Sequence, residues 1–295
     1  MRIASCLIVA ALAACPRAAS GGVLGRIPAG EPGLAYEIAI AACRGDRCPI
    51  EIRLVRGRDV LDRARTGRSA TSARAEPEKV LPGWGAGDPL TAPPGLTAWA
   101  TGEEEGHVAI AARPIALDAG VHGVLIDTQA GFDHLKRQHE IWIARAGRLR
   151  RAWTHDEGAG PTWSSTAIAA NARGFEDLVL FDAFSRDAMD EPDRLDVTAL
   201  TWKSGALRPR PPPPVWASVI GRFDAAISAR NAIEAGAACL AGYRVIPGRR
   251  FGLPARNVLA VPSLSRAAAQ RAAARAGKCR STVRARVARL IRPAE

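Results

Sequence analysis

Alternating apolar and polar positions in the first two thirds of the chain predict β-strands. In residues 49–55, Ile50, Ile52 and Leu54 alternate with charged residues, which is the period of a strand buried on one face. Gly, Asp and Asn turn residues separate further short segments of this kind. We expect strands over residues 36–43, 49–55, 107–112, 123–128, 140–144, 149–154, 165–170, 178–184 and 195–202.

The regular spacing of these strands favours an all-β domain over residues 21–203, either an antiparallel sandwich or a barrel-like sheet. Ala146-Gly147 predicts a tight hairpin turn between two of the strands. Residues 64–106 are rich in Gly, Pro, Ser, Thr and Glu, so we expect a long loop there. A propeller is less favoured, because the sequence has no clear internal repeat.

A proline-rich segment, residues 204–214, is the expected boundary between this domain and a second one. It contains four successive prolines, Pro211 to Pro214, which favour a stiff polyproline II spacer. After it, strand and helix patterns alternate, and Ser265 is placed to cap the second helix. The expected strands are 215–220, 243–246, 257–261 and 282–290, and the expected helices are 225–240 and 265–276.

The fold class is therefore α+β, with the all-β domain followed by a small β-α-β-β-α-β domain over residues 215–295. In this domain, the strand-Gly-Phe segment 215–223, the alanine-rich helix after it, and the strand-then-helix segment 258–270 resemble the sporulation-related repeat (SPOR) family. The resemblance implies a peptidoglycan-binding domain that covers about a quarter of the chain.

Strand alternation also predicts a ligand-binding face on the C-terminal sheet. If Ala217 and Val219 face the helices, the opposite face is open and carries an aromatic ring among guanidinium groups. Such a surface can stack on a sugar and pair with carboxylate or phosphate, and the alternative is an ordinary solvated face. The residues on this predicted face are Trp216, Ser218, Arg244, Arg284 and Arg286.

The net charge of +12 lies entirely in the C-terminal domain. Of the 41 basic and 29 acidic residues of the chain, 15 and three fall in residues 215–295, which leaves 26 of each elsewhere. This partition predicts an anionic partner, peptidoglycan or another anionic polymer. Nucleic acid is not expected, because the strand at 257–261 has no ring for a base to stack on, unlike RNA-recognition modules of the same topology.

The first 20 residues have the features of a signal peptide: Arg2, an apolar run, and small residues before Gly21. The alternative is a lipoprotein signal with a lipid on Cys15, the one way in which we expect the protein to be held at a membrane. We therefore expect a periplasmic or extracellular protein with disulfides. Cys43 and Cys48 form the simplest pair. Elimination then pairs Cys239 with Cys279, although antiparallel helices would place these cysteines apart. Either Cys279 folds back, or the predicted topology is wrong, or both thiols stay free.

Catalytic, metal and cofactor motifs are not found in the sequence, and none is predicted. The histidines His134, His139 and His155 are expected to be surface polar residues. The acidic residues between Asp182 and Asp196 are expected to form a solvated loop rather than a calcium site. The sequence thus favours a non-enzymatic envelope protein. The alternative is an envelope enzyme with its site in residues 107–203, which would require an acid, a base and a nucleophile to converge there.

Overall fold

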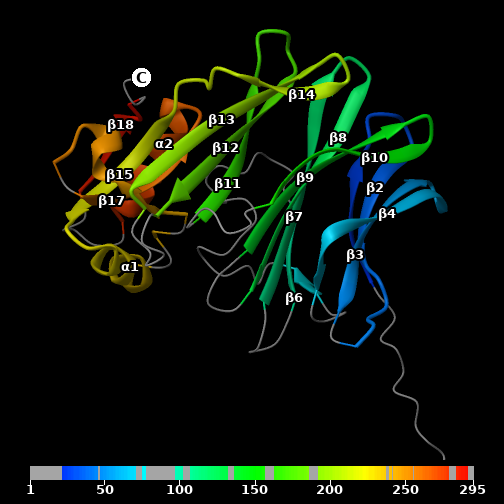
Figure 1. Cartoon of the computed structure of the whole chain (residues 1–295), viewed down its shortest axis with the longest axis horizontal. Helices are drawn as coiled ribbons and strands as arrows, with labels where there is room; N and C mark the ends of the chain where they lie inside the picture. Colours follow the sequence, from blue (N-terminus) through cyan, green and yellow to red (C-terminus); the bar gives the residue numbers. More distant parts are fainter. Residues whose placement is uncertain are drawn as a thin grey trace, which may run out of the picture.

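The chain forms four antiparallel sheets, and each sheet packs against the one that follows it in the sequence (Figure 1). The computed structural model describes residues 22–45, 47–70, 75–77, 97–101, 107–131, 136–156, 163–185, 192–236, 239–240, 242–254, 256–278 and 284–291. The prediction of a β-rich fold is confirmed.

The first two sheets hold the strands up to residue 156. The first sheet has the order β1-β2-β3-β4, with β1 (Val23–Pro28), β2 (Leu34–Ile40), β3 (Cys48–Arg56) and β4 (Asp59–Ala70). The second has the order β10-β9-β8-β7-β6-β5, with β5 (Ala75–Pro77), β6 (Thr97–Thr101), β7 (His107–Asp118), β8 (Val121–Gly131), β9 (Lys136–Arg145) and β10 (Arg148–Asp156). Strands that follow one another in the chain pair with one another, so both sheets are meanders.

The third sheet is a further meander, and the fourth is not. The third has the order β11-β12-β13-β14, with β11 (Trp163–Ala170), β12 (Glu176–Phe184), β13 (Arg194–Lys203) and β14 (Ala206–Arg210). The fourth has the order β16-β17-β15-β18, with β15 (Trp216–Phe223), β16 (Arg244–Pro247), β17 (Asn257–Ser263) and β18 (Ala285–Arg289). The helices α1 (Ala226–Ala235) and α2 (Arg266–Ala276) complete the β-α-β-β-α-β order, and η1 (Gly248–Phe251) is a short 3-10 turn.

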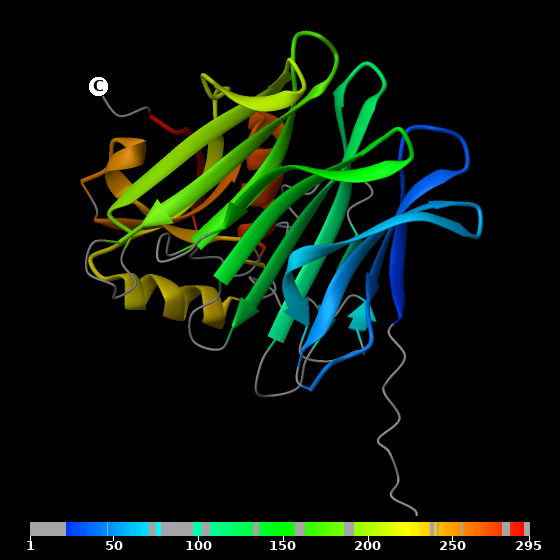
Figure 2. The ribbon, with the colours of Figure 1, turned by 45° about the vertical axis from the view of Figure 1, so that its right-hand side comes forward.

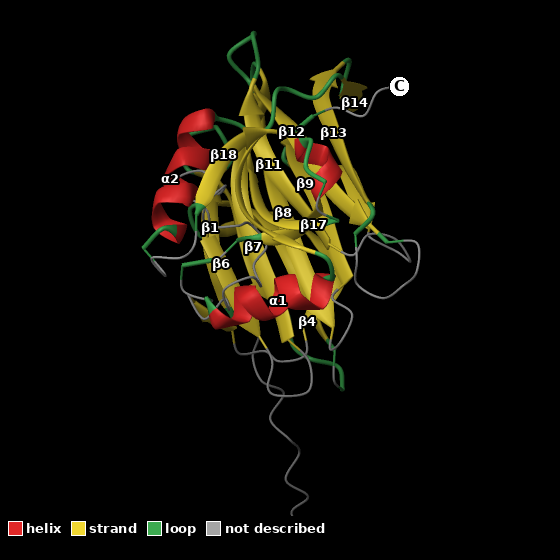
Figure 3. Cartoon of the chain, turned by 90° about the vertical axis from the view of Figure 1, so that its left-hand side faces the viewer, coloured by secondary structure: helices red, strands yellow, loops and turns green. Residues whose placement is uncertain are grey.

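Four apolar clusters join these layers, from right to left in Figure 1 and again in the turned view of Figure 2. Tyr36 and Ile38 of the first sheet pack with Ile110 of the second. The other face of the second sheet packs on the third, and the other face of the third packs on the fourth. The helices cover the last face, and Figure 3 shows α1 across the lower part of this end and α2 at its side.

Tyr36 fastens the first sheet to the second by hydrogen bonds at a single oxygen. Its hydroxyl donates to the carbonyl of His122 at 2.7 Å and accepts from the amide of Ala144 at 2.8 Å. Burial raises the pKa of Tyr36 to about 12, against the opposing effect of the Ala144 hydrogen bond. The phenol is therefore neutral and fully partnered inside the stack.

Several local predictions are confirmed. Ala146 and Gly147 both have positive φ, 50° and 74°, as a two-residue hairpin turn between β9 and β10 requires. The side chain of Ser265 accepts the hydrogen bond of the Ala268 amide and caps α2. The expected strands of residues 36–202 all overlap strands of the structure.

Two predictions about connecting segments are wrong. Residues 64–106 are not one loop, since β4 continues to Ala70 and the segment contains β5 and β6. Residues 204–214 are not only a spacer, because β14 pairs with β13 across a turn at Ser204-Gly205. The third and fourth sheets also share one apolar cluster, so the two sides of the proline segment are not separate cores.

Candidate functional site

The residues predicted to share an open face lie on both faces of the fourth sheet, and neither face is open. Ser218 is fully buried on the helix side, where its hydroxyl shares a 2.6 Å hydrogen bond with Tyr243. Ala217 and Val219, expected under the helices, pack instead against the third sheet. The inferred facing was wrong because alternation tells which residues share a face, but not which layer covers it.

The three predicted arginines are divided in the same way. Arg244 is half-buried and lies opposite Ala260, on the face that packs on the third sheet. Arg286 lies opposite Val219 on the edge strand β18 and is exposed, as is Arg284 just before the strand. These arginines therefore do not surround Trp216.

Trp216 has a different pair of basic neighbours, which the sequence prediction missed. The Arg266 guanidinium lies over its ring, 5.6 Å from the ring centroid, and Arg289 lies directly across from it on β18. Trp216 is half-buried, whereas both arginines are exposed. We name Trp216, Arg266 and Arg289 the Trp216 cluster. Its ring and cations can contact a sugar and an anion together.

Partly buried and exposed arginines of the first three sheets include several that pair with a carboxylate. Arg26, Arg53 and Arg151 each pair with a glutamate, and Arg210 pairs with Asp177. Eight exposed basic residues of the fourth layer have no carboxylate partner within the described parts of the chain; they are Arg222, Arg249, Arg266, Arg271, Lys278, Arg284, Arg286 and Arg289. Arg249 instead donates to the backbone carbonyl of Asp193.

A cavity of about 830 Å³ lies between β13 and the proline segment. Pro211 to Pro214 form part of its wall, and Leu195 and Val197 also line it. Arg250 and Arg289 add two guanidinium groups, so the cavity adjoins the Trp216 cluster through Arg289. Burial lowers the pKa of Arg250, an effect that nearby Asp196 opposes.

The cysteines of the described residues are bonded. Cys43 and Cys48 form the predicted disulfide, with an S–S distance of 2.05 Å. Cys239 is also disulfide-bonded, while its predicted partner Cys279 and the alternative lipid site Cys15 lie outside the described residues. Arg275, in the last turn of α2, donates to the carbonyl of Cys239 at 3.4 Å. The end of α2 therefore lies beside Cys239, contrary to the expectation that helix ends would be far from it.

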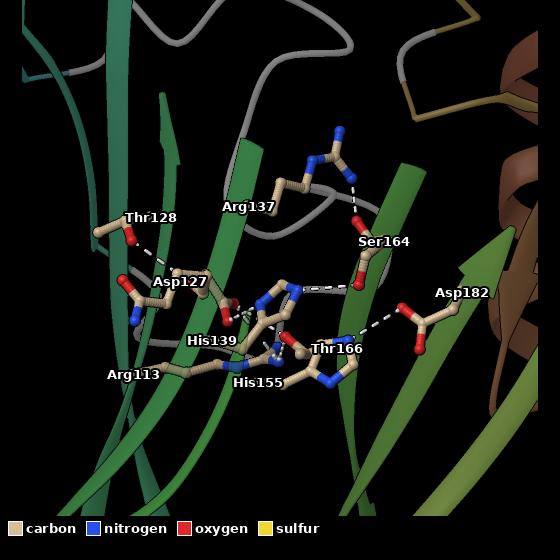
Figure 4. A network of polar contacts seen from close by, with 10 residues as sticks. Arg113, Asp127, Thr128, Arg137, His139, His155, Ser164, Thr166 and Asp182 are labelled. Carbon is tan, nitrogen blue, oxygen red and sulfur yellow. Dashed lines mark hydrogen bonds and ion pairs between the residues drawn. The ribbon is translucent and has the colours of Figure 1, made fainter. Parts of the chain in front are cut away.

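A buried network of polar side chains lies between the second and third sheets (Figure 4). His139 on β9 contacts Asp127 on β8 through Nδ1 at 2.7 Å, and Ser164 on β11 through Nε2 at 2.9 Å. The three residues are only 1–2% exposed. His139 is thus not the surface residue that the sequence analysis expected.

Two further residues hold Asp127 in place. Thr166 donates to its Oδ2 at 2.8 Å, and Arg113 lies 4.0 Å from the same oxygen. Arg113 also donates to Thr166 at 2.6 Å. The Nε and Nη1 atoms of Arg113 are buried without a hydrogen-bond partner among the described residues.

The charges and hydrogen bonds of the network stabilise the ionised form of Asp127. Burial alone would raise its pKa, but the charge and hydrogen bond of His139, the charge of Arg113 and the hydrogen bond of Thr166 outweigh burial and lower it. Burial lowers the pKa of Arg113, while Asp127 and Glu176 oppose that shift. The positive charge of Arg113 and the negative charge of Asp127 therefore each stabilise the ionised form of the other.

Two more contacts extend the network. Arg137 donates to the backbone carbonyl of Ser164. His155 on β10 stacks beside His139, with ring centroids 6.1 Å apart, and its Nε2 lies 3.5 Å from Asp182 on β12. Asp182 is 6% exposed and lies within β12, so it is not part of a solvated loop, while Asp187, Asp190 and Glu191 of the predicted loop lie outside the described residues.

No metal-binding group of three or more His, Cys, Asp or Glu side chains is found among the described residues. Within the same ranges, no helix has the length and apolar character needed to cross a bilayer. Comparison with protein families, with curated proteins and with solved structures finds no match to this chain. The resemblance to the SPOR family therefore stays a prediction.

Proposed function

We propose that this is an exported cell-envelope protein that binds peptidoglycan or another anionic polymer through its fourth, basic layer. The observation that carries the proposal is the Trp216 cluster, in which the ring of Trp216 lies against the guanidinium of Arg266 and opposite the exposed Arg289. The binding face is thus the β15–β18–α2 side, and not the sheet face that strand alternation first suggested.

The chemistry of such a polymer fits this surface. A glycan offers ring faces for contact with Trp216, and peptide or phosphate groups offer anions for the guanidinium groups of Arg266 and Arg289. Several exposed arginines on one layer also raise the local concentration of a polyanion before contact. Their attraction is screened beyond about 8–10 Å at physiological salt. Binding should therefore have a salt-sensitive part and a part that depends on the ring.

Export is supported by the N-terminal sequence and by cysteine use. The charged start, apolar run and small residues before Gly21 fit a cleaved signal peptide, and the alternative is a lipid on Cys15. The Cys43–Cys48 disulfide is typical of an oxidising compartment such as the periplasm. Mass spectrometry of the mature protein should show an N-terminus near Gly21 or a lipid-bearing Cys15. An intact Met1 would contradict export.

The binding experiment uses the folded chain without its first 20 residues and purified peptidoglycan sacculi. We expect the protein to cosediment at low salt and to bind less as the salt concentration rises. The binding that remains at high salt should be lost in Trp216→Ala. Trp153→Ala is the matched control, because Trp153 is another half-buried tryptophan, in β10 of the second sheet. Absence of cosedimentation at low salt by the folded wild-type protein would overturn the proposal.

A further inference from the structure

We propose that Asp127, His139 and Ser164 form an acyl-transfer triad that hydrolyses carboxylic esters. This inference is independent of polymer binding, because it rests on a different pair of sheets. It corresponds to the alternative that the sequence left open, an enzyme site within residues 107–203.

The geometry matches the roles of a nucleophile, a base and an orienting acid. Nε2 of His139 lies 2.9 Å from Oγ of Ser164, within reach for proton transfer. Nδ1 lies 2.7 Å from Asp127. With the ring proton on Nδ1, His139 donates to Asp127 and leaves Nε2 to accept the serine proton. Figure 4 shows the imidazole between the two side chains.

The surroundings of Asp127 favour this tautomer. Its second oxygen accepts the Thr166 hydroxyl, and Arg113 lies close enough to stabilise the negative charge. An ionised, immobile carboxylate stabilises the imidazolium that forms when Ser164 loses its proton. Thr166 and Arg113 are therefore positioning residues, which act on His139 through Asp127.

The reaction needs only the ester and water. Oγ of Ser164 bonds to the ester carbonyl carbon while its proton passes to Nε2 of His139. The bond from that carbon to the alcohol oxygen then breaks, and the alcohol leaves with the proton from Nε2. Water adds to the acyl carbon in the same way, His139 takes its proton, and Ser164 leaves and recovers that proton. Acid and alcohol are released, and nothing is oxidised or reduced.

The position of Ser164 places a requirement on how a substrate reaches it. Ser164 is the second residue of β11, and Arg137 is the second residue of β9, so the network occupies the end of the sheet pair at which both strands begin. The apolar cluster of Ile115, Leu125 and Leu178 fills the space between the same two sheets and closes it on that side. Ser164 is 1% exposed, so the proposal requires that an ester can reach it from the end of the sheet pair away from this cluster.

The test uses a fluorophosphonate, which phosphonylates activated serines, on the chain without its first 20 residues. We expect one adduct, on the peptide that carries Ser164. Hydrolysis of p-nitrophenyl acetate should fall at least about 100-fold in Ser164→Ala and in His139→Gln. Ser165→Ala is the matched control: Ser165 is the next residue on β11, points to the opposite face of the sheet, and should keep full activity.

Labelling of the wild-type protein decides the question even if a variant fails to fold. An adduct that forms on Ser164 and disappears in a folded His139→Gln protein supports the triad. A folded wild-type protein that forms no Ser164 adduct, or that hydrolyses the ester no faster than folded Ser164→Ala, would show that the network only holds the sheets together. Either result leaves the sacculus experiment unaffected, so failure of one proposal is distinguishable from failure of the other.

Discussion

The hydroxyl of Tyr36, in the first sheet, donates a 2.7 Å hydrogen bond to the backbone carbonyl of His122 in the second. Tyr36→Phe removes this bond and the one from Ala144 while keeping the ring, so two partly buried backbone groups lose this partner. We expect the free energy of unfolding to fall by roughly 1–3 kcal/mol. Urea unfolding followed by circular dichroism measures the change.

High pH provides the control for this variant. An unfolded tyrosine ionises near pH 10, whereas burial raises the pKa of folded Tyr36 to about 12. The stability from Tyr36 is therefore complete below about pH 10 and is lost as the pH rises to about 12. The difference between wild type and Tyr36→Phe should shrink over this interval. A difference that is constant with pH would contradict the assigned role of the hydroxyl.

Asp127 should make the protein sensitive to acid. Its folded pKa is lowered, so its contribution to stability is present above the ordinary aspartate pKa of about 4 and is lost as the pH falls through the folded value. Urea midpoints should drop below pH 4 more steeply in wild type than in Asp127→Asn. Asp59→Asn, which changes an exposed carboxylate at the start of β4, should leave the acid sensitivity as in wild type.

The fourth layer should not be stable alone. A chain restricted to residues 215–295 would expose the apolar face that packs on the third sheet, including Ala217, Val219 and Val258. We expect it to aggregate or to lack a cooperative thermal transition, while the chain from residue 21 melts cooperatively. A monomeric fragment with a sharp transition would show that the shared core is dispensable.

Arg266 should contribute more to polymer binding than arginines away from Trp216. Arg266→Ala removes a charge and the ring contact of 5.6 Å, so both the salt-sensitive and the salt-resistant parts of sacculus binding should fall. Arg284→Ala should reduce only the salt-sensitive part, and Arg150→Ala, an exposed arginine of β10, should change neither. Cosedimentation at two salt concentrations separates these outcomes, and equal effects of all three changes would argue against a defined site.

The mature protein should have no free thiol among Cys43, Cys48, Cys239 and Cys279. We expect the unreduced, unfolded chain to resist alkylation at Cys43, Cys48 and Cys239, and peptide mapping to join Cys239 to Cys279. Alkylation of Cys279 without reduction would contradict that pairing. Reduction beforehand should expose all of these thiols and serves as the positive control.

The sequence was sufficient for most strands because burial on one face imposes a period of two, as in residues 49–55. The sequence did not allow us to predict which layer of the structure covers each face of a strand. Ala217 and Ser218 alternate correctly, yet Ser218 faces the helices, because Tyr243 provides a hydroxyl there that satisfies it. The turn at Ser204-Gly205 has the same φ signs as the turn at Ala146-Gly147. The prolines that follow it favour a spacer over a strand, so β14 could not be predicted.

The buried network left one local trace in the sequence. Asp127 is two residues after the buried Leu125 in β8, so strand alternation places both side chains on the same, buried face of the sheet. A buried carboxylate is stable only with hydrogen-bond or charge partners, so such partners are expected near Asp127. Their identity could not be predicted, since His139 and Ser164 reach Asp127 through strand register and through the packing of two sheets, neither of which a single segment specifies.

Because each sheet packs on the sheet that follows it, the chain can fold vectorially. During synthesis, the strands of the β1–β4 meander are complete in sequence before the strands that cover them, so each later meander can pack on a sheet whose strands have already been made. Loop closures between layers stay short in sequence, which lowers their entropic cost. The basic fourth layer is the last to be synthesised, and its apolar face needs the third sheet as a partner.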